Sequence, residues 1–450
     1  MAAPSASTIS RNTQPKRFSH AMRSFPLSAQ KSPATAARIA AATLLALLAA
    51  CASAPEPVPV ARAPEPLVCP PVKEPACPAP PAPAAPAPAP EPVDYRGRLV
   101  PGSWVDLPDW GHESMKPSLV AFARSCAVLE KQDPWKAVCA GAQTLTDAME
   151  PEIASFFQLN FDPWQVVNAD ASTSGMVTGY YEPLLHGSLV KSSRYKYPLY
   201  AAPSDLLTID LTELYPDLKH RRLRGRLVGN KVVPYLTREA IEGDASPLRG
   251  KELVWVDDAV DAFFLHIQGS GQVEMEDGTR MRVGYADQNG HPFRSLGRLL
   301  IQRGELPPER ASMQGIKDWA RRNPRKLQEY LNANPSYVFF KELQRDLPGP
   351  IGALGVPLTP ERSIAVDQRV IPLGVPVYLA TTWPNTAEPL ERLMVAQDTG
   401  GAINGGVRAD FFWGFGDPAG SQAGKMRQSG RMWVLLPKGY VPTQAAPPAR

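Results

Sequence analysis

The most informative part of this 450-residue sequence reads Ala396-Gln397-Asp398-Thr399-Gly400-Gly401-Ala402-Ile403-Asn404-Gly405-Gly406-Val407-Arg408-Ala409-Asp410-Phe411-Phe412-Trp413-Gly414. It places two carboxylates, Asp398 and Asp410, at the ends of a loop with four glycines, and three aromatic residues follow directly. Glycine lets the backbone approach a ligand closely. A carboxyl group bordered by this loop and these aromatics can lie in an apolar pocket that raises its pKa, as a general acid requires near neutral pH. A Gly-rich hairpin whose aspartates only cap turns is the alternative on this pattern alone.

The first fifty residues have the composition of an export signal. They carry six basic residues, no acidic one, and an apolar run over residues 39–50. A positive segment, a short apolar core and small residues before a cleavage point are typical of a secretory signal peptide, and the run is too short to span a bilayer comfortably. We therefore predict a signal peptide over 1–50, with Met1 and Met22 both open as its start.

The residues around Cys51 resemble the lipobox of bacterial lipoproteins. Leu48-Ala49-Ala50 precede Cys51, which in such proteins becomes the lipidated N-terminus. Ala52 stands where an aspartate would signal retention in the inner membrane. The resemblance implies a lipid anchor in the outer membrane, facing the periplasm, and an ordinary signal with a chance cysteine is the alternative.

Without the leader, the chain has a small negative net charge. Removing the six leader charges from the formal +4 leaves −2, so no basic patch argues for nucleic-acid binding.

Residues 55–92 hold sixteen prolines, with alanine as the main other residue, which favours an extended tether. At about 3.1 Å per residue, roughly forty residues reach on the order of 120 Å. We expect residues 51–94 to be this tether and 441–450 to be a C-terminal tail.

Four cysteines remain after Cys51. An exported protein meets an oxidising compartment, where cysteines can pair. Cys126 and Cys139 flank a predicted helix-turn region and are the preferred disulfide. Cys69 and Cys77 lie in the extended segment, so they pair locally or remain free. Three pairings are formally open.

The globular part, from about residue 95 to 440, shows a β-rich α+β pattern. Short apolar runs between glycines and prolines, at 254–256, 262–267 and 375–379, indicate strands. Such short strands with intervening turns favour barrels over a doubly wound sheet. Helical periodicity predicts five helices, over 119–131, 135–148, 293–303, 312–322 and 325–332.

Several common chemistries lack their motifs. The histidines are scattered without metal-ligand spacing, so no metal or other cofactor is expected. Ser270 lies in Gly269-Ser270-Gly271, which is not a nucleophile elbow, and the loop of glycines lacks the Lys-Ser/Thr of a phosphate-binding loop. Aromatic and amide side chains recur instead in 179–183, 266–271 and 285–290, and these groups suit sugar rings and acetamido groups. Each segment alone equally fits a buried aromatic residue beside a turn, whereas together with export they favour a saccharide polymer as substrate.

Several motifs in the globular part resemble those of a known family. The sequence resembles the MltA family of membrane-bound lytic murein transglycosylases, in the family's order, through Thr178-Gly179-Tyr180-Tyr181-Glu182-Pro183, Phe264-Leu265-His266-Ile267-Gln268-Gly269-Ser270-Gly271, Asn334-Pro335-Ser336-Tyr337-Val338-Phe339-Phe340, Gly355-Val356-Pro357-Leu358-Thr359-Pro360, Arg362-Ser363-Ile364-Ala365-Val366-Asp367, Ile371-Pro372-Leu373-Gly374 and the segment from Asp398 to Asp410. The resemblance spans nearly the whole globular part and excludes the leader and the tether.

The resemblance implies a fold and a set of site residues. The fold would be a double-psi β-barrel over 95–189 and 335–440, with a smaller β-domain inserted over 190–334 and a substrate groove between them. Asp410 matches the family's catalytic aspartate, Asp398 its supporting aspartate, and Asp367 a structural aspartate in a turn before Ile371-Pro372. Five further residues are expected in the substrate cleft: Gly400, Gly401, Tyr180, Gln268 and Ser336.

The implied reaction needs one acid/base group. Lytic transglycosylases cleave the β-1,4 bond between N-acetylmuramic acid and N-acetylglucosamine without water, and the product ends in a 1,6-anhydromuramoyl ring. Because the attacking group is the C6 hydroxyl of the substrate itself, no second carboxylate is required, unlike in glycoside hydrolysis. The implied role is murein turnover and recycling. The implied partners are peptidoglycan strands, outer-membrane lipid through the anchor, and cell-wall synthesis or division complexes.

Two other functions stay open from the residues. One is a hydrolytic muramidase that pairs Asp410 with Asp398 or Glu182. The other is a wall-binding lipoprotein without catalysis, since double-psi barrels also occur in expansin-like proteins. Anhydro product ends would identify the transglycosylase, reducing ends the hydrolase, and binding without release of muropeptides the wall-binding protein.

Overall fold

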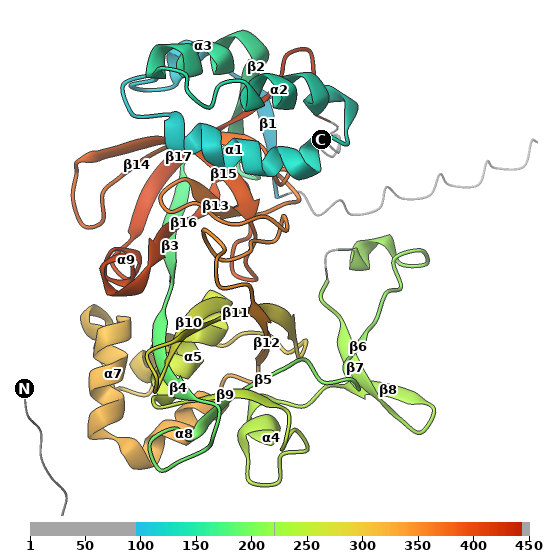
Figure 1. Ribbon diagram of the computed structural model, residues 1–450, viewed down its shortest axis with the longest axis vertical. Coiled ribbons are helices and arrows are strands. Elements are labelled where there is room, and N and C mark those ends of the chain that lie inside the picture. The colour runs from blue at the N-terminus through green and yellow to red at the C-terminus, as the bar shows by residue number, and fades with distance from the viewer. Residues whose placement is uncertain (1–95, 220, 443–450) are drawn as a thin grey trace, which may run out of the picture. The chain divides into compact units, whose positions relative to one another are not determined.

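In the computed structural model of the chain, the described residues are 96–219 and 221–442 (Figure 1). The predicted signal peptide, Cys51, the tether with Cys69 and Cys77, and most of the predicted C-terminal tail lie outside the described residues. Within the described ranges, no helix is both long enough and apolar enough to cross a membrane.

A mixed sheet of eight strands forms the larger part of the fold. Its strands, in spatial order, are β1 (Gly97–Pro101), β2 (Phe161–Asn168), β17 (Arg427–Pro437), β14 (Pro376–Thr382), β15 (Pro389–Asp398), β13 (Ser363–Val366), β16 (Arg408–Phe415) and β3 (Gly175–Glu182). The long strand β17 pairs antiparallel with β2, with β14 and, through its first residues, with β3. Strand β3 also runs parallel to β16, so two segments that are far apart in the sequence are neighbours in the sheet.

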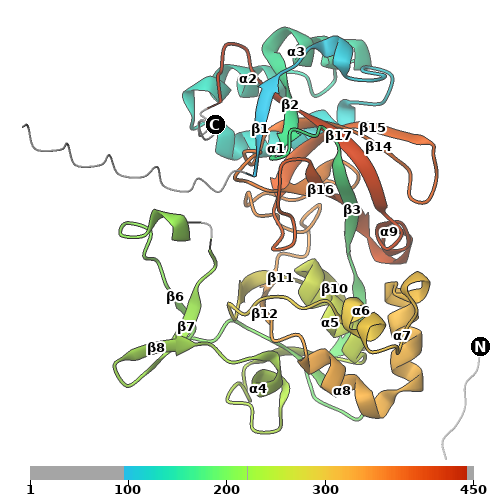
Figure 2. The ribbon, with the colours of Figure 1, turned by 180° about the vertical axis from the view of Figure 1, so that it is seen from behind.

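Three helices from the N-terminal part of the described chain cover this sheet. Helices α1 (Lys116–Leu129), α2 (Asp133–Gln143) and α3 (Glu150–Asn160) lie together beside the large sheet in both views (Figures 1 and 2). Phe122, Phe157 and Phe161 are fully buried and contact one another edge to face or tilted, with ring centroids 5.5 to 6.1 Å apart. Aromatic pairs in these geometries add to the free energy of apolar burial. The main core therefore lies between these helices and one face of the large sheet.

The predicted disulfide is confirmed. Cys126 of α1 and Cys139 of α2 are joined, with Cα atoms 5.4 Å apart. Predicted helices 119–131 and 135–148 correspond to α1 and α2, shifted toward the N-terminus because Pro117 and Pro134 stand in the first turns of the two helices.

A second body of sheet and helix lies between β3 and β13 in the sequence. Its six-stranded sheet has the order β12 (Val338–Leu343), β11 (Arg280–Gln288), β10 (Ser270–Met275), β4 (Leu184–Ser188), β9 (Glu252–Val256) and β5 (Tyr197–Tyr200). A separate three-stranded sheet, β6 (Leu207–Thr208), β7 (Arg224–Val228) and β8 (Lys231–Pro234), stands away from it in both views (Figures 1 and 2).

The inserted part, from β4 to β12, contains helices as well as strands. It holds helices α4 (Arg238–Glu242), α5 (Ala259–Gln268), α6 (Leu296–Gln302), α7 (Met313–Arg322) and α8 (Pro324–Asn332). The last three agree with the predicted helices over 293–303, 312–322 and 325–332. Its six-stranded sheet uses β4 and β12, which lie just outside the predicted range 190–334.

The strand prediction over 262–267 is wrong. These residues belong to α5, which begins after Asp258, whose carboxylate accepts hydrogen bonds from the amides of Val260 and Asp261. The helix ends at Gly269, which has φ 81°. A short apolar run does not by itself separate a buried helix from a buried strand, and the capping residues at its two ends decide for the helix.

Besides α5, three of the described α-helices were not predicted from the sequence. They are α3, which buries Ile153, Phe156 and Phe157 at helical spacing, α4, which has only five residues, and α9 (Gly416–Ala423), which is short and contains two glycines. Helix α9 follows β16 directly and packs against β3 and β16. It therefore covers the strands that carry the site described below.

We predict that removing the disulfide destabilises the α1–α2 pair. Replacing both Cys126 and Cys139 by alanine opens a crosslink across a sequence separation of 13 residues, and should lower the free energy of unfolding by about 3 kcal/mol. Urea unfolding of the variant and the wild type measures this difference. Reductant should bring the wild type down to the variant and leave the variant unchanged; equal stability under oxidising conditions would contradict the prediction.

Candidate active site

Strand register brings the two aspartates of residues 396–414 to the same part of the large sheet. Ala365 of β13 pairs with Asp398 of β15 on one side and with Asp410 of β16 on the other. Asp410 in turn pairs with Thr178 of β3. Directly paired residues present their side chains to the same face of a sheet. With strands about 4.8 Å apart, the Cα atoms of the two aspartates are about 10 Å from each other.

Alternation along β16 separates the three aromatics that follow Asp410. Phe412 lies on the face of Asp410, where it joins a small apolar cluster with Leu358, Ala365, Ile403 and Tyr180. Phe411 and Trp413 point to the opposite face and belong to the main core. The expectation that all three aromatics border the carboxylate is therefore wrong, because successive side chains of a strand point to opposite faces.

Gly179 of β3 is required by this packing of the opposite face. A Cβ at this position would lie 2.6 Å from the Nε1 atom of Trp413 and 2.9 Å from the Cα of Ala423. Strand β3 can therefore approach β16 and α9 only with glycine here, and this close approach holds Thr178 and Tyr180 beside Asp410 and Phe412.

Asp410 is a largely buried carboxyl group with a single hydrogen-bond donor among the described residues. The hydroxyl of Thr178 donates to its Oδ1 atom at 2.6 Å. Burial raises the pKa of Asp410 to about 6, against the opposing effects of the Thr178 hydrogen bond and the Arg408 charge, and the charge of Asp398 adds to the rise. Near neutral pH this group therefore exchanges its proton readily, as an acid/base catalyst must.

Asp398 is held by three donors. Its Oδ1 atom accepts from the backbone amides of Ala353 and Thr399, each at 2.9 Å, and its Oδ2 atom accepts from the hydroxyl of Tyr180 at 3.1 Å. Burial raises the pKa of Asp398, while these hydrogen bonds and the charge of Arg222 act in the opposite direction. Since all three neighbours donate, they favour the carboxylate form, so the two aspartates have different surroundings although they lie on one sheet face.

Asp367 fixes the end of the glycine-containing loop. It begins the turn after β13, as expected, and forms two hydrogen bonds of 2.7 Å with Arg369 and one of 2.9 Å with the backbone amide of Gly405. Arg369 also donates to the side chain of Asn404. These charge-assisted contacts lower the pKa of Asp367 against the effect of burial, so this aspartate acts as an anion that holds the loop leading into β16.

The two glycines expected in the cleft differ in their surroundings. A Cβ on Gly401 would meet no described atom within 4 Å, whereas one on Gly400 would lie 2.8 Å from Ile403. Gly401 is exposed and lies three residues after Asp398. The loop therefore has open space at Gly401, and Gly400 is packed on the apolar cluster beside Asp410.

The other predicted cleft residues lie at different distances from the aspartates. Tyr180 contacts Asp398 directly, and burial together with Asp398 and Asp410 raises its pKa far above the usual value, so it stays a donor. The side chain of Gln268 accepts from the backbone amide of Tyr181 at 3.1 Å. Ser336 is buried in the inserted part, where its carbonyl accepts from Arg238 at 2.9 Å. No contact within the described ranges joins Ser336 to either aspartate.

Glu182, the alternative second carboxylate, is engaged elsewhere. It is 1% exposed and pairs with Arg282 at 3.0 Å, and it accepts from Gln272 at 3.1 Å. This buried ion pair lies where β3 leads into β4. Glu182 is therefore not placed to activate water beside Asp410.

Two residues of the site were missed by the sequence analysis. Thr178 donates to Asp410, and Arg408 donates to Thr178 at 3.0 Å. Both stand inside quoted motifs, and the signal that could have identified Thr178 is its spacing of two from Tyr180, which puts both on one face of β3.

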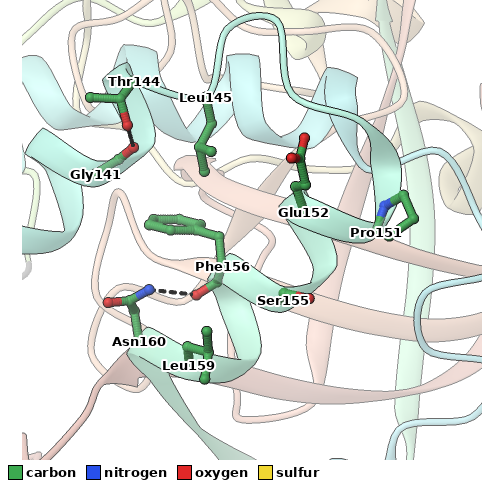
Figure 3. A pocket seen from close by; sticks show the side chains of 9 residues that line it. All are labelled: Gly141, Thr144, Leu145, Pro151, Glu152, Ser155, Phe156, Leu159 and Asn160. Carbon is green, nitrogen blue, oxygen red and sulfur yellow. Dashed lines mark hydrogen bonds between the residues drawn. The ribbon is translucent and has the colours of Figure 1, made fainter.

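A surface hollow elsewhere has no such chemistry. It has a volume of about 510 Å³ and lies between α2 and α3, lined by Leu145, Phe156 and Leu159 among others (Figure 3). Its carboxylate, Glu152, accepts from the backbone amide of Met149 at the start of α3, and Asn160 donates to the carbonyl of Phe156. In the part of the chain that the structure describes, no group of three or more His, Cys, Asp or Glu side chains is arranged to hold a metal ion.

The raised pKa of Asp410 predicts a stability change with a defined sign. A carboxyl group with a folded-state pKa of about 6, against an ordinary 3.8, stabilises the fold below its unfolded pKa and loses this contribution as the pH rises through 6. The free energy of unfolding of Asp410→Asn, relative to that of the wild type, should therefore rise between pH 4 and pH 8 by up to about 3 kcal/mol. Urea unfolding at the two pH values measures the change.

Asp170→Asn is the matched control for this prediction. Asp170 is exposed, and hydrogen bonds from Ser172 lower its pKa. Removing its charge should therefore give no stabilisation at pH 8. An Asp410→Asn variant whose difference from the wild type is the same at pH 4 and pH 8 would disprove the pKa shift.

Comparisons with known proteins match both parts of the structure. The family model described as the MltA specific insert domain matches residues 176–341, and the 3D domain model matches residues 362–436, which include all three aspartates of the site. Membrane-bound lytic murein transglycosylase A of Escherichia coli K12 is 33% identical over 287 residues, covering 62% of this chain and 70% of the relative.

Solved structures agree with these matches. The crystal structure of MltA from Neisseria gonorrhoeae is 39% identical, with a TM-score of 0.67, and covers 78% of this chain and 97% of that one. The structure of E. coli MltA with bound chitohexaose is 27% identical, with a TM-score of 0.58, and covers 76% and 95%. Since a relative more than 30% identical is matched over more than two thirds of its length and the two family models cover both parts of the structure, the chain belongs to the MltA family.

Proposed function

We propose that this protein is a peptidoglycan lytic transglycosylase. It cleaves the β-1,4 bond between N-acetylmuramic acid and N-acetylglucosamine and leaves 1,6-anhydromuramoyl ends, in murein turnover and recycling. Its relatives are named lytic murein transglycosylases, and one relative has been crystallised with a chitohexaose. The observation that carries the proposal is the unequal pair of carboxyl groups: Asp410 has one donor and a pKa of about 6, and Asp398 has three donors.

Asp410 acts first as the acid and then as the base. Neutral Asp410 donates its proton to the glycosidic oxygen, and the C1–O bond breaks with its electron pair on that oxygen. The C6 hydroxyl oxygen of the muramoyl residue then bonds to C1, and its proton passes to the Asp410 carboxylate. The substrate supplies its own nucleophile in a favourable position, so the single acid/base group is restored after each cycle.

Asp398 supports this reaction without exchanging a proton. Its three donors favour its carboxylate form against the effect of burial, and its charge raises the pKa of Asp410. It also anchors Ala353 and Thr399, so it orders the start of the loop that contains Gly401. The open space at Gly401 leaves room for a sugar ring near the backbone.

The two rival functions are less well supported by the geometry. A hydrolase needs a second carboxylate that is free to attack or to activate water. Asp398 is occupied by three donors, and Glu182 is paired with Arg282. A wall-binding protein without catalysis has no need of a buried acid with a pKa of about 6.

The test is the product spectrum of purified sacculi digested with wild-type and variant protein. Mass spectrometry should find anhydro ends with the wild type, and Asp410→Asn should reduce their release by at least about 10³-fold, because its amide cannot donate a proton of suitable acidity. Binding of Asp410→Asn to insoluble peptidoglycan should persist. Reducing ends in the wild-type digest, or substantial activity in Asp410→Asn, would reject the assignment.

Asp398→Asn is the control that ranks the two aspartates. Its amide oxygen can still accept from Ala353 and Thr399, so the loop stays ordered and we expect a smaller loss than for Asp410→Asn. A loss as large as that of Asp410→Asn would reverse the two roles.

We further propose a double-psi β-barrel arrangement for the strands around the site. Pairing of β17 with both β14 and β3 supports it, since each of the strands β17, β14, β15, β13, β16 and β3 then has a neighbour on both sides. In this arrangement the segments from β1 to β3 and from β13 to β17 form the catalytic domain, the segment from β4 to β12 forms the inserted domain, and the glycan lies in a groove between them. An experimental structure with a bound glycan tests this arrangement.

We also propose that the mature protein is a lipoprotein of the outer membrane. The relative from E. coli is named membrane-bound. The motif at Cys51 supplies a lipid anchor, and a proline-rich tether behind it leaves room for cell-wall synthesis or division complexes. Metabolic labelling with palmitate should mark the wild type and not Cys51→Ala; labelling of both proteins would reject the anchor.

A further inference from the structure

A chain of two hydrogen bonds leads from Arg408 through Thr178 to Asp410. The Nη2 atom of Arg408 donates to the Oγ1 atom of Thr178 at 3.0 Å, and the Thr178 hydroxyl donates to Oδ1 of Asp410 at 2.6 Å. A guanidinium group has only donors, whereas a threonine hydroxyl has one proton and two lone pairs. Arg408 occupies one lone pair of Oγ1, and the only proton of Thr178 is directed to Asp410.

This polarity determines which oxygen of Asp410 can hold a proton. Oδ1 accepts from Thr178, and an oxygen that carried the proton would be a weaker acceptor, so this hydrogen bond favours the proton on the other oxygen, Oδ2. Across the described ranges, no protein group donates to Oδ2. We propose that Arg408 and Thr178 keep the acidic proton of Asp410 on Oδ2, which makes Thr178 a positioning residue of the reaction; the proposal rests on the transglycosylase function proposed above.

The two donors of this hydrogen-bond chain, Arg408 and Thr178, are held in place by the sheet. The Nη1 atom of Arg408 also donates to the carbonyls of Met176, at 3.2 Å, and Ala409, at 2.5 Å, so its guanidinium has three acceptors in fixed positions. Thr178 pairs with Asp410 in the parallel ladder between β3 and β16. Its β-branched side chain has few rotamers, and the hydroxyl therefore stays on the Oδ1 side.

These two hydrogen bonds make Oδ2 of Asp410 the atom that gives and receives the proton in both steps of the reaction. The proton leaves Oδ2 for the glycosidic oxygen as the C1–O bond breaks, and the C6 hydroxyl proton returns to Oδ2 as the new C1–O bond forms. Oδ1 keeps its bond to Thr178 throughout, so the carboxyl group does not rotate between the two steps. The hydrogen bond also stabilises the carboxylate, which limits the rise in pKa that burial causes.

A purely structural cross-strand hydrogen bond would have different consequences. Loss of such a hydrogen bond would lower the fraction of folded protein and so reduce activity by the same factor at every pH. Losing a donor to the ionised form of the acid would instead move the pH at which activity declines. The pH dependence therefore separates the two roles.

The experiment compares wild type, Thr178→Val and Thr178→Ser on purified sacculi between pH 4 and pH 9. In the wild type, kcat/KM should decline above about pH 6, where Asp410 loses its proton. In Thr178→Val the declining limb should move to higher pH by about one unit, and kcat at low pH should fall roughly tenfold. Thr178→Ser keeps the hydroxyl and should restore both values.

A direct titration gives a readout that does not use activity. Carbon-13 NMR of aspartate carboxyl groups, with the Asp410 signal identified by its absence in Asp410→Asn, should show the same upward shift in Thr178→Val. Thr381→Val is the matched control, because Thr381 is buried in the same large sheet and its hydroxyl donates to the Ser429 carbonyl at 2.8 Å. That variant should leave the titration midpoint unchanged.

The outcomes separate the two proposals. A Thr178→Val enzyme with an unshifted midpoint and activity lowered equally at every pH overturns the positioning role, while Asp410→Asn can remain inactive. An active Asp410→Asn enzyme rejects the proposed function itself. If Thr178→Val does not fold, Thr178→Ala removes the same hydroxyl with less bulk, and an unshifted midpoint in that variant overturns the positioning role equally.

Discussion

The site depends on the register of β13 with its two neighbours. Ala365 pairs with Asp398 in a parallel ladder and with Asp410 in an antiparallel one, so two residues that are twelve apart in the sequence point to one face, separated only by a small side chain. A shift of one residue in either pairing would turn one aspartate into the main core, where an ionisable group is costly. The apolar residues on the opposite face, such as Ala409 and Phe411, oppose that shift.

The different chemistry of the two aspartates follows from backbone amides rather than from residue type. Asp398 ends β15, where the chain turns and free amides are available, and it accepts from Ala353 and Thr399. Asp410 lies inside β16, where the amides are used by the strand ladders, and among the described residues it accepts from the Thr178 side chain alone. Burial raises the pKa of both carboxyl groups, and it is opposed by three hydrogen-bond donors at Asp398 and by the Thr178 hydroxyl and the Arg408 charge at Asp410.

The inserted part is tied to the strand that carries half of the site. Strand β3 holds Thr178 and Tyr180 beside the aspartates and ends at Glu182, whose ion pair with Arg282 lies in the inserted sheet. Gln268, at the end of α5, accepts from the backbone amide of Tyr181. The inserted part thus contributes to the position of β3, and through it to the hydroxyl groups that contact Asp398 and Asp410.

The amino-acid sequence alone predicted the local features: the disulfide-bonded cysteines, five of the described helices, and Asp398 and Asp410 as candidate site residues. These follow from periodicity, spacing and motifs, which are properties of neighbouring residues. Only the tertiary structure decided that Phe411 and Trp413 leave the site, that residues 262–267 form a helix, and that Thr178 and Arg408 contact Asp410. Those outcomes depend on strand register and on capping, and Thr178 and Asp410 are 232 residues apart. A hydrogen bond between such distant residues has no local signal in the sequence, because only the pairing of β3 with β16 brings them together.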